Sequence, residues 1–130
     1  MSLTKEQILG ADDLKREKVK VREWGGEVIV QEMTAVERVA LMEWGIRLRE
    51  EDETKYNTQA AAKIVSLCVV DEGGDKLFED ADLDLLVRKN HRILERISEV
   101  ARRLSGMREE DNEEMIKNSN EGQSEDSISG

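Results

Sequence analysis

The sequence contains no proline and a single cysteine, Cys68. Without proline, its turns must be built from glycine, aspartate and asparagine. One cysteine excludes an internal disulfide, and its place in the apolar run "AAAKIVSLCVV" predicts a buried, unreactive thiol in a reducing compartment. No apolar stretch approaches the roughly 20 residues needed to cross a bilayer, and the N-terminus lacks the layout of a secretory signal. We therefore expect a soluble, cytoplasmic protein.

Histidine is equally scarce, since His91 is the only one. A metal site of three or four His or Cys ligands cannot be built from these residues, and a catalytic triad would depend on His91, which we expect to be solvated. The acidic segment "DEGGDKLFEDAD" is a poor calcium loop because Lys76 holds its sixth position and Asp82 its twelfth. No phosphate-binding glycine loop is present. We therefore predict no enzyme activity, no metal and no cofactor.

Basic residues are outnumbered. Thirty Asp and Glu face twenty Lys and Arg, and the net charge of -10 disfavours binding to nucleic acids or to anionic membranes. Residues 107–130 hold eight acids and two bases, net -6, whereas residues 1–106 hold 22 acids and 18 bases, net -4. A segment of such composition buries too little apolar surface to fold alone. We predict one domain over residues 1–117 and a disordered acidic tail over residues 118–130.

A β-hairpin is predicted over about residues 18–33. Valines alternate with charged residues on both sides of Gly25-Gly26, a pair suited to a two-residue turn. Such a turn would pair Trp24 with Glu27 and Val21 with Val30, and would place all four valines (Val19, Val21, Val28 and Val30) on one face. That face should pack against helices, because a lone hairpin is marginal in water.

The opposite face of the hairpin is a candidate partner-binding surface. It would carry Arg22, Trp24, Glu27 and Ile29, a mixed set with two large apolar side chains. Exposed aromatic residues are enriched at interaction hot spots, which favours contact of Trp24 with a partner, although burial of this side chain is the alternative. For Trp44, on an apolar helix, packing in the core is the favoured interpretation.

Four helices are predicted over about residues 5–9, 35–50, 58–70 and 81–89, and a sixth, short one within residues 108–118. Between the last two, Ile93, Ile97, Val100 and Leu104 form a helical stripe, which predicts a fifth helix that ends at Gly106. Thr4 with Gln7, and Thr34 with Glu37, have the spacing of capping boxes. The helix over 35–50 is apolar on more than one side, which predicts a central helix with two neighbours. The end of "VSLCVV" is also good strand material. The expected fold is α+β and mainly α, a hairpin packed on a small bundle of about four helices.

Three stretches of the chain resemble one known family. They are "LTKEQILGADDLKREKVKVREWGGEVIVQEMTAVER", "DEGGDKLFEDADLDLL" and "RRLSGM". Together they resemble the tail assembly chaperones of long-tailed bacteriophages and prophages, over about residues 3–118. The "EWGG" turn and the Asp-Gly turn before "LF" are the most specific parts. Family members often have proline before the Glu of "EWGG", where this chain has Arg22.

The resemblance implies a non-catalytic helper of tail building in the host cytoplasm that is absent from the finished virion. Such proteins bind the tape-measure protein, keep it soluble and help tail-tube subunits assemble on it, and many also have a longer, frameshifted form. The alternative is an acidic protein that inhibits a host nuclease or regulator, either by mimicking DNA or as an adaptor. The sequence leaves the oligomeric state open.

Overall fold

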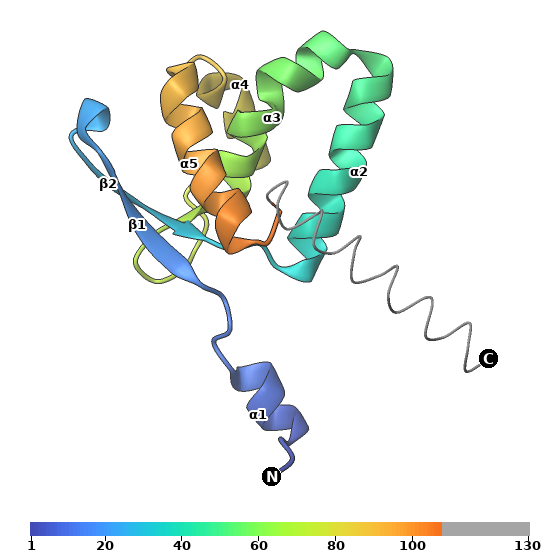
Figure 1. The fold of residues 1–130 in the computed structure, drawn as a ribbon, viewed down its shortest axis with the longest axis vertical. Coiled ribbons are helices and arrows are strands. Elements are labelled where there is room, and N and C mark those ends of the chain that lie inside the picture. The colour runs from blue at the N-terminus through green and yellow to red at the C-terminus, as the bar shows by residue number, and fades with distance from the viewer. Residues whose placement is uncertain (108–130) are drawn as a thin grey trace, which may run out of the picture.

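The structure is a computed structural model and describes residues 1–107. Figure 1 shows a small β-sheet packed beside a group of helices, with the first helix standing away from them. The predicted helix within residues 108–118, the predicted tail over 118–130 and the predicted domain boundary between them lie outside the described residues. The α+β, mainly α architecture with a hairpin on a small helical bundle is confirmed.

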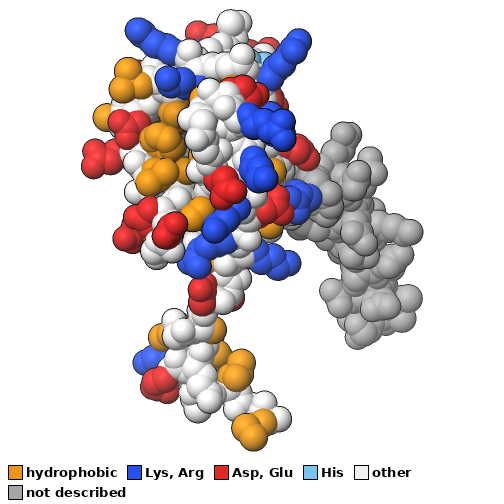
Figure 2. Space-filling view, turned by 90° about the vertical axis from the view of Figure 1, so that its left-hand side faces the viewer, with side chains coloured by type: hydrophobic (Ala, Val, Ile, Leu, Met, Phe, Trp, Pro, Cys, Tyr) orange, Lys and Arg blue, Asp and Glu red, His pale blue; other side chains and the backbone are white. Residues whose placement is uncertain are grey.

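Helix α1 (Lys5–Gly10) forms where its capping box predicts it. The Thr4 hydroxyl accepts from the Gln7 amide at 3.2 Å, and the Gln7 side chain accepts from the Thr4 amide at 2.9 Å. This helix buries none of its residues, and Leu3, Ile8 and Leu9 are all exposed. In Figure 2 hydrophobic side chains are visible on this arm, at the lower end of the molecule.

The hairpin consists of β1 (Arg16–Val21) and β2 (Gly26–Gln31), joined by the 3₁₀ turn η1 (Arg22–Trp24) and Gly25. Val19 lies opposite Val28 and Val21 opposite Gly26. The predicted register is therefore wrong: Glu27 pairs with Lys20, and Trp24 lies in the turn. The turn takes four residues because Gly25, at φ 78°, donates its amide to the Arg22 carbonyl at 3.0 Å. The predicted two-residue turn and the observed four-residue turn both have an even number of residues, so the four valines still share one face.

A third strand, β3 (Val69–Val70), pairs antiparallel with β2 and makes β2 the central strand. It follows directly on α3 (Glu53–Cys68), so the helix predicted over 58–70 starts five residues earlier and ends two residues earlier. The early start has a local cause, because the Asp52 carboxylate accepts from the Lys55 amide at 3.0 Å and caps the helix. The last two residues of the predicted helix, Val69 and Val70, are extended instead, because they pair with β2.

The chain turns back after β3 through the segment that superficially resembles a calcium loop. The Asp71 carboxylate accepts from the amides of Gly73 at 2.9 Å and Asp75 at 3.0 Å, and Gly74 has φ 89°. Asp71 therefore stabilises a turn in its own backbone. In place of the helix predicted over 81–89 there are only the 3₁₀ turn η2 (Asp80–Asp82) and α4 (Leu83–Leu86).

The last described helix, α5 (His91–Leu104), has Asn90 as its N-cap and ends just before Gly106, which has φ 66°. Its predicted stripe is confirmed, because Ile93, Ile97 and Ala101 are buried while Val100 and Leu104 pack at the edge of the core. His91 is solvated as expected, with 73% of its side chain exposed.

Helix α3 is the centre of the core, between α2 (Ala35–Glu51) and α5. Six of its residues are buried: Ala61, Ala62, Ile64, Val65, Ser66 and Cys68. The prediction of a buried Cys68 is confirmed, and burial raises the pKa of its thiol to about 12. The prediction that residues 35–50 form the central helix is wrong. Only Leu41 of α2 is buried, because the apolar residues of α2 are spread around its circumference and α3 covers one side.

Candidate functional site

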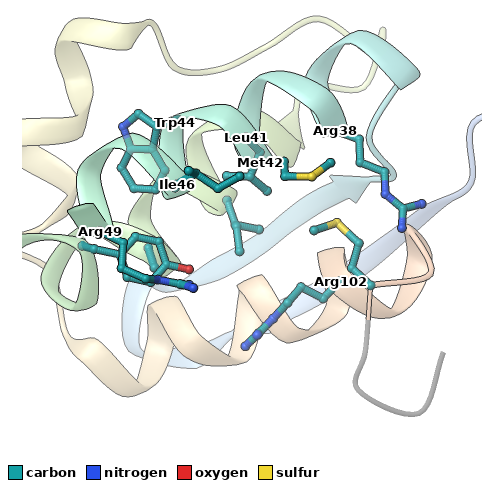
Figure 3. Close-up of a pocket in the computed structure, with 12 residues that line it drawn as sticks. Arg38, Leu41, Met42, Trp44, Ile46, Arg49 and Arg102 are labelled. Atoms are coloured by element: carbon teal, nitrogen blue, oxygen red, sulfur yellow. The ribbon is translucent and has the colours of Figure 1, made fainter. Parts of the chain in front are cut away.

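A groove of about 370 Å³ lies between α2, α3 and the end of α5. Helix α2 provides one wall and α3 the floor, while α5 and the residue that ends the described chain provide the other wall (Figure 3). The lining is apolar apart from three arginines and consists of Arg38, Leu41, Met42, Trp44, Gly45, Ile46, Arg49, Tyr56, Ala60, Ile64, Arg102 and Met107. Figure 3 places Arg38 and Arg49 at opposite ends of the groove and Arg102 on α5, across the groove from α2.

Next to the groove, α2 has an exposed apolar stripe. Val36, Val39, Met42 and Ile46 recur every three or four residues and are each at least half exposed. Residues at this spacing lie on one face of a helix. Met42 and Ile46 belong to both the stripe and the groove, so the two form one continuous apolar surface. Isolated exposed apolar side chains are ordinary, whereas a contiguous apolar surface beside a groove is typical of a binding site.

A sharp turn at Asp52 produces the α2–α3 wall of the groove. The Asp52 amide donates to the Leu48 carbonyl at 2.7 Å and ends α2, while the Asp52 carboxylate starts α3. One residue thus serves both helix ends, which leaves the two helices side by side in Figure 1.

Aromatic contacts then hold the two helices together near this turn. The rings of Trp44 and Tyr56 lie 6.0 Å apart, and the Arg49 guanidinium stands over the Tyr56 ring at 4.3 Å. Gly45 permits this approach, because a Cβ there would come within 3.2 Å of the Tyr56 ring. Trp44 is half-buried in this cluster and packs at the edge of the core, close to the expected role.

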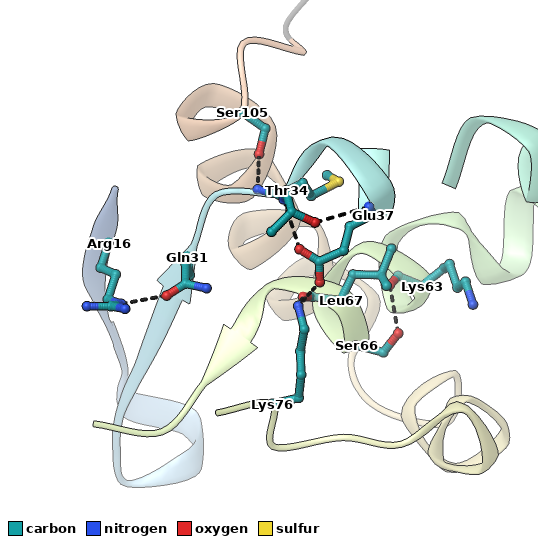
Figure 4. Close-up of polar contacts among 10 residues, drawn as sticks. Arg16, Gln31, Thr34, Glu37, Lys63, Ser66, Leu67, Lys76 and Ser105 are labelled. Atoms are coloured by element: carbon teal, nitrogen blue, oxygen red, sulfur yellow. Dashed lines mark hydrogen bonds and ion pairs between the residues drawn. The ribbon is translucent and has the colours of Figure 1, made fainter. Parts of the chain in front are cut away.

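The opposite end of the groove is closed by contacts between α5 and the start of α2. The Ser105 hydroxyl accepts from the buried Met33 amide at 3.0 Å (Figure 4). Arg38 donates to the Ser105 carbonyl at 3.2 Å. These bonds join residues about seventy positions apart in the sequence. They bring Arg38 and Met107 to the same end of the groove.

A polar cluster secures the first turn of α2 to the rest of the fold. The Thr34 hydroxyl accepts from the Glu37 amide at 3.2 Å, and the Glu37 carboxylate accepts from the Thr34 amide at 2.9 Å and from Lys76. Lys76 also donates to the Leu67 carbonyl, as Figure 4 shows. Burial opposes ionisation of Glu37, but the bonds from Lys76 and Thr34 outweigh it, so the pKa of Glu37 lies below its ordinary value. This cluster fixes the direction in which α2 leaves the core.

The structure separates the hairpin residues that the sequence grouped. Arg22 and Trp24 lie in the turn, and 40% of Trp24 is exposed. Glu27 and Ile29 lie in β2, with Ile29 half-buried between Lys18 and Val70. The turn is tied to α5 by an ion pair of 2.9 Å between Glu23 and Arg96. No observation tests whether the four predicted residues contact a partner, and their role stays a prediction.

The sequence analysis missed the groove, although the signal was present. The apolar residues around the whole circumference of α2 suggested two buried sides, whereas one of those sides is exposed. Within residues 1–107 no cluster of three or more His, Cys, Asp or Glu could hold a metal ion. In the same part of the chain no helix is long and apolar enough to span a membrane.

The fold and the groove define a small, mainly helical α+β protein with an apolar groove between α2, α3 and α5. A family described as phage tail assembly chaperone matches residues 5–118. The chain therefore belongs to the phage tail assembly chaperone family. The partners of this family are tail proteins. No curated protein sequence matches it.

The structure also resembles that of the tail assembly chaperone of bacteriophage HK97, with a TM-score of 0.59 and 17% sequence identity. The alignment covers 76% of this chain and 94% of that one. This likeness shows a shared fold.

Proposed function

We propose that the protein binds the tape-measure protein of its phage, keeps it soluble and helps tail-tube subunits assemble on it. The observation that carries the proposal is the continuous apolar surface of α2, formed by the groove and the stripe. A tape-measure protein is expected to be long and helical with apolar faces. An apolar helix lying in an apolar groove is a common mode of protein recognition.

The dimensions of the groove suit such an occupant. Arg38 and Arg49, at its two ends, are eleven residues apart on α2, which corresponds to about 16 Å at 1.5 Å per residue. That length matches about three turns of a docked helix. The hairpin turn with Arg22 and Trp24, and the strand with Glu27 and Ile29, form a second, separate contact in this proposal.

The role is non-catalytic, in the host cytoplasm and limited to the assembly stage, so the protein is absent from the mature virion. The alternative, an acidic inhibitor that mimics DNA, requires unpaired carboxylates ordered along the folded surface. Several carboxylates are instead paired with bases: Glu17 with Arg103, Glu23 with Arg96, and Glu37 with Lys76. These ion pairs favour the chaperone role.

Co-expression with the tape-measure protein tests the proposal. The tagged chain should recover soluble tape-measure protein, and Met42→Glu with Ile46→Glu should abolish the recovery because two charges would be buried in the groove. Leu85→Glu is the control, since Leu85 is an exposed apolar residue on α4, outside the groove lining. Unchanged recovery with the double variant would refute the groove as the binding site.

The hairpin contact needs its own variant. Trp24→Ala removes the largest exposed side chain of the turn while leaving the groove intact. Reduced recovery is expected, and unchanged recovery would refute this part of the proposal alone.

The proteins of purified virions, separated by mass, should include the tube protein and not this chain.

A further inference from the structure

The described chain ends at the groove. Met107 is one of the residues that line it, and the Arg38 guanidinium donates to the carbonyl of Ser105, two residues earlier. Residue 108 therefore begins at the end of the groove formed by Arg38. Whatever follows is tethered within reach of this surface.

The groove is basic in an acidic protein. Its lining, as far as the described residues form it, contains three arginines and no Asp or Glu, although the whole chain has a net charge of -10. Arg102 is incompletely paired within residues 1–107: its Nε is buried without a hydrogen-bond partner. Its terminal nitrogen forms ion pairs of 3.8 Å with Glu95 and with Glu99, which are longer than hydrogen bonds and leave Nε without a partner in this part of the chain. The groove thus attracts a ligand with both carboxylates and apolar groups.

The sequence that follows Met107 has this composition. Residues 108–116 read "REEDNEEMI", in which five acids precede Met115 and Ile116. Nine residues span up to about 30 Å when extended and about 14 Å as a helix. The groove is about 16 Å from Arg38 to Arg49 along α2, so this segment is long enough to cover most or all of it.

We propose that residues 108–116 fold back into the groove of their own chain. The acids at 109–114 lie toward Arg38 and Arg102, and Met115 and Ile116 cover Ile46. The segment thereby competes with the apolar helix that the groove receives. The competition rests on the proposed function, whereas the occupancy of the groove does not.

Tethering makes a weak contact sufficient. A segment joined to its site by a short linker has an effective concentration on the order of millimolar, so no tight binding is needed. If the segment fills the groove about nine-tenths of the time, the apparent affinity for a competing partner falls about tenfold. Without a partner, the groove would then be free about a tenth of the time.

A spin label tests the occupancy without any partner. Ser119→Cys places a reactive thiol just beyond the segment, and the buried Cys68 should not compete for the nitroxide reagent. The label should broaden the methyl resonances of Met42 and Ile46 but not those of Ile8 on α1 or Leu85 on α4. Equal intensities at all four residues would overturn the proposal.

Charge variants give a matched comparison. Glu110→Gln, Glu113→Gln and Glu114→Gln remove three charges from the segment, whereas Glu121→Gln, Glu125→Gln and Asp126→Asn remove three charges beyond it. The first set should abolish the broadening and the second should preserve it. Spin-labelled chain mixed with isotope-labelled chain should produce no broadening, and broadening in that mixture would overturn contact within one chain.

Binding experiments separate this inference from the proposed function. The full chain with Glu110→Gln, Glu113→Gln and Glu114→Gln should bind a helical tape-measure fragment about tenfold more tightly than the unchanged chain. Equal affinities would overturn the competition. If neither chain binds the fragment while the spin label still broadens Met42 and Ile46, the proposed function fails and the occupancy stands.

Discussion

Removing two apolar side chains from the groove should weaken binding of the tape-measure protein and leave the fold intact. Met42 and Ile46 are 56% and 53% exposed in the free protein, so about half of each side chain remains to be covered by a partner. Full burial of such a side chain contributes about 1.5–3 kcal/mol. The exposed halves together therefore contribute about 2 kcal/mol to binding, and Met42→Ala with Ile46→Ala should raise Kd about 30-fold.

Fluorescence anisotropy with a dye-labelled helical fragment of the tape-measure protein measures this effect. Thermal unfolding of the same samples should show only a small loss of stability, because neither side chain is buried in the core. Leu85→Ala, on α4 and outside the groove lining, should leave Kd within about twofold of the original value. Wild-type affinity in the double variant, or an equal loss in Leu85→Ala, would refute the reasoning.

Three further predictions concern the fold and its polar cluster. Ile97→Ala removes a fully buried side chain and should lower the free energy of unfolding by about 2–5 kcal/mol in urea titrations; a loss below about 1 kcal/mol would contradict the packing. Because the pKa of Glu37 is lowered by folding, its stabilising contribution is present above its unfolded pKa of about 4.3 and is lost as the pH falls through the folded value. The stability advantage over Glu37→Gln should therefore shrink on acidification, and a constant difference would count against the Lys76 pairing. Cys68, with its pKa raised to about 12, should not react with a thiol reagent near neutral pH until the protein is unfolded, and labelling of the native chain would contradict its burial.

The elements with local causes were predictable from the sequence. Both threonine capping boxes form as predicted because their hydrogen bonds join residues three positions apart. The stripe of α5 and the valine face of the hairpin also follow from short-range periodicity. The hairpin register did not follow, since a four-residue turn and a two-residue turn place the same valines on the same face.

The boundaries of α3 depended on partners elsewhere in the chain. Val69 and Val70 suit a helix or a strand by composition, and pairing with β2 decides for the strand. The predicted partner-binding face of the hairpin assumed a two-residue turn. In the observed register, Trp24 lies in the turn and Ile29 lies in the central strand of the sheet. Their contact with a partner is still a prediction.

The sequence by itself determined the helical class, the capped helix starts, the alternation of the hairpin and the concentration of acidic charge after residue 106, because each arises from neighbouring residues. Only the tertiary structure decided which apolar residues remain exposed. Helix α2 has apolar residues on all sides, and nothing local distinguishes the side that α3 covers from the side that faces solvent. That choice depends on the turn at Asp52 and on the Ser105 contacts, which join distant parts of the chain and create the groove.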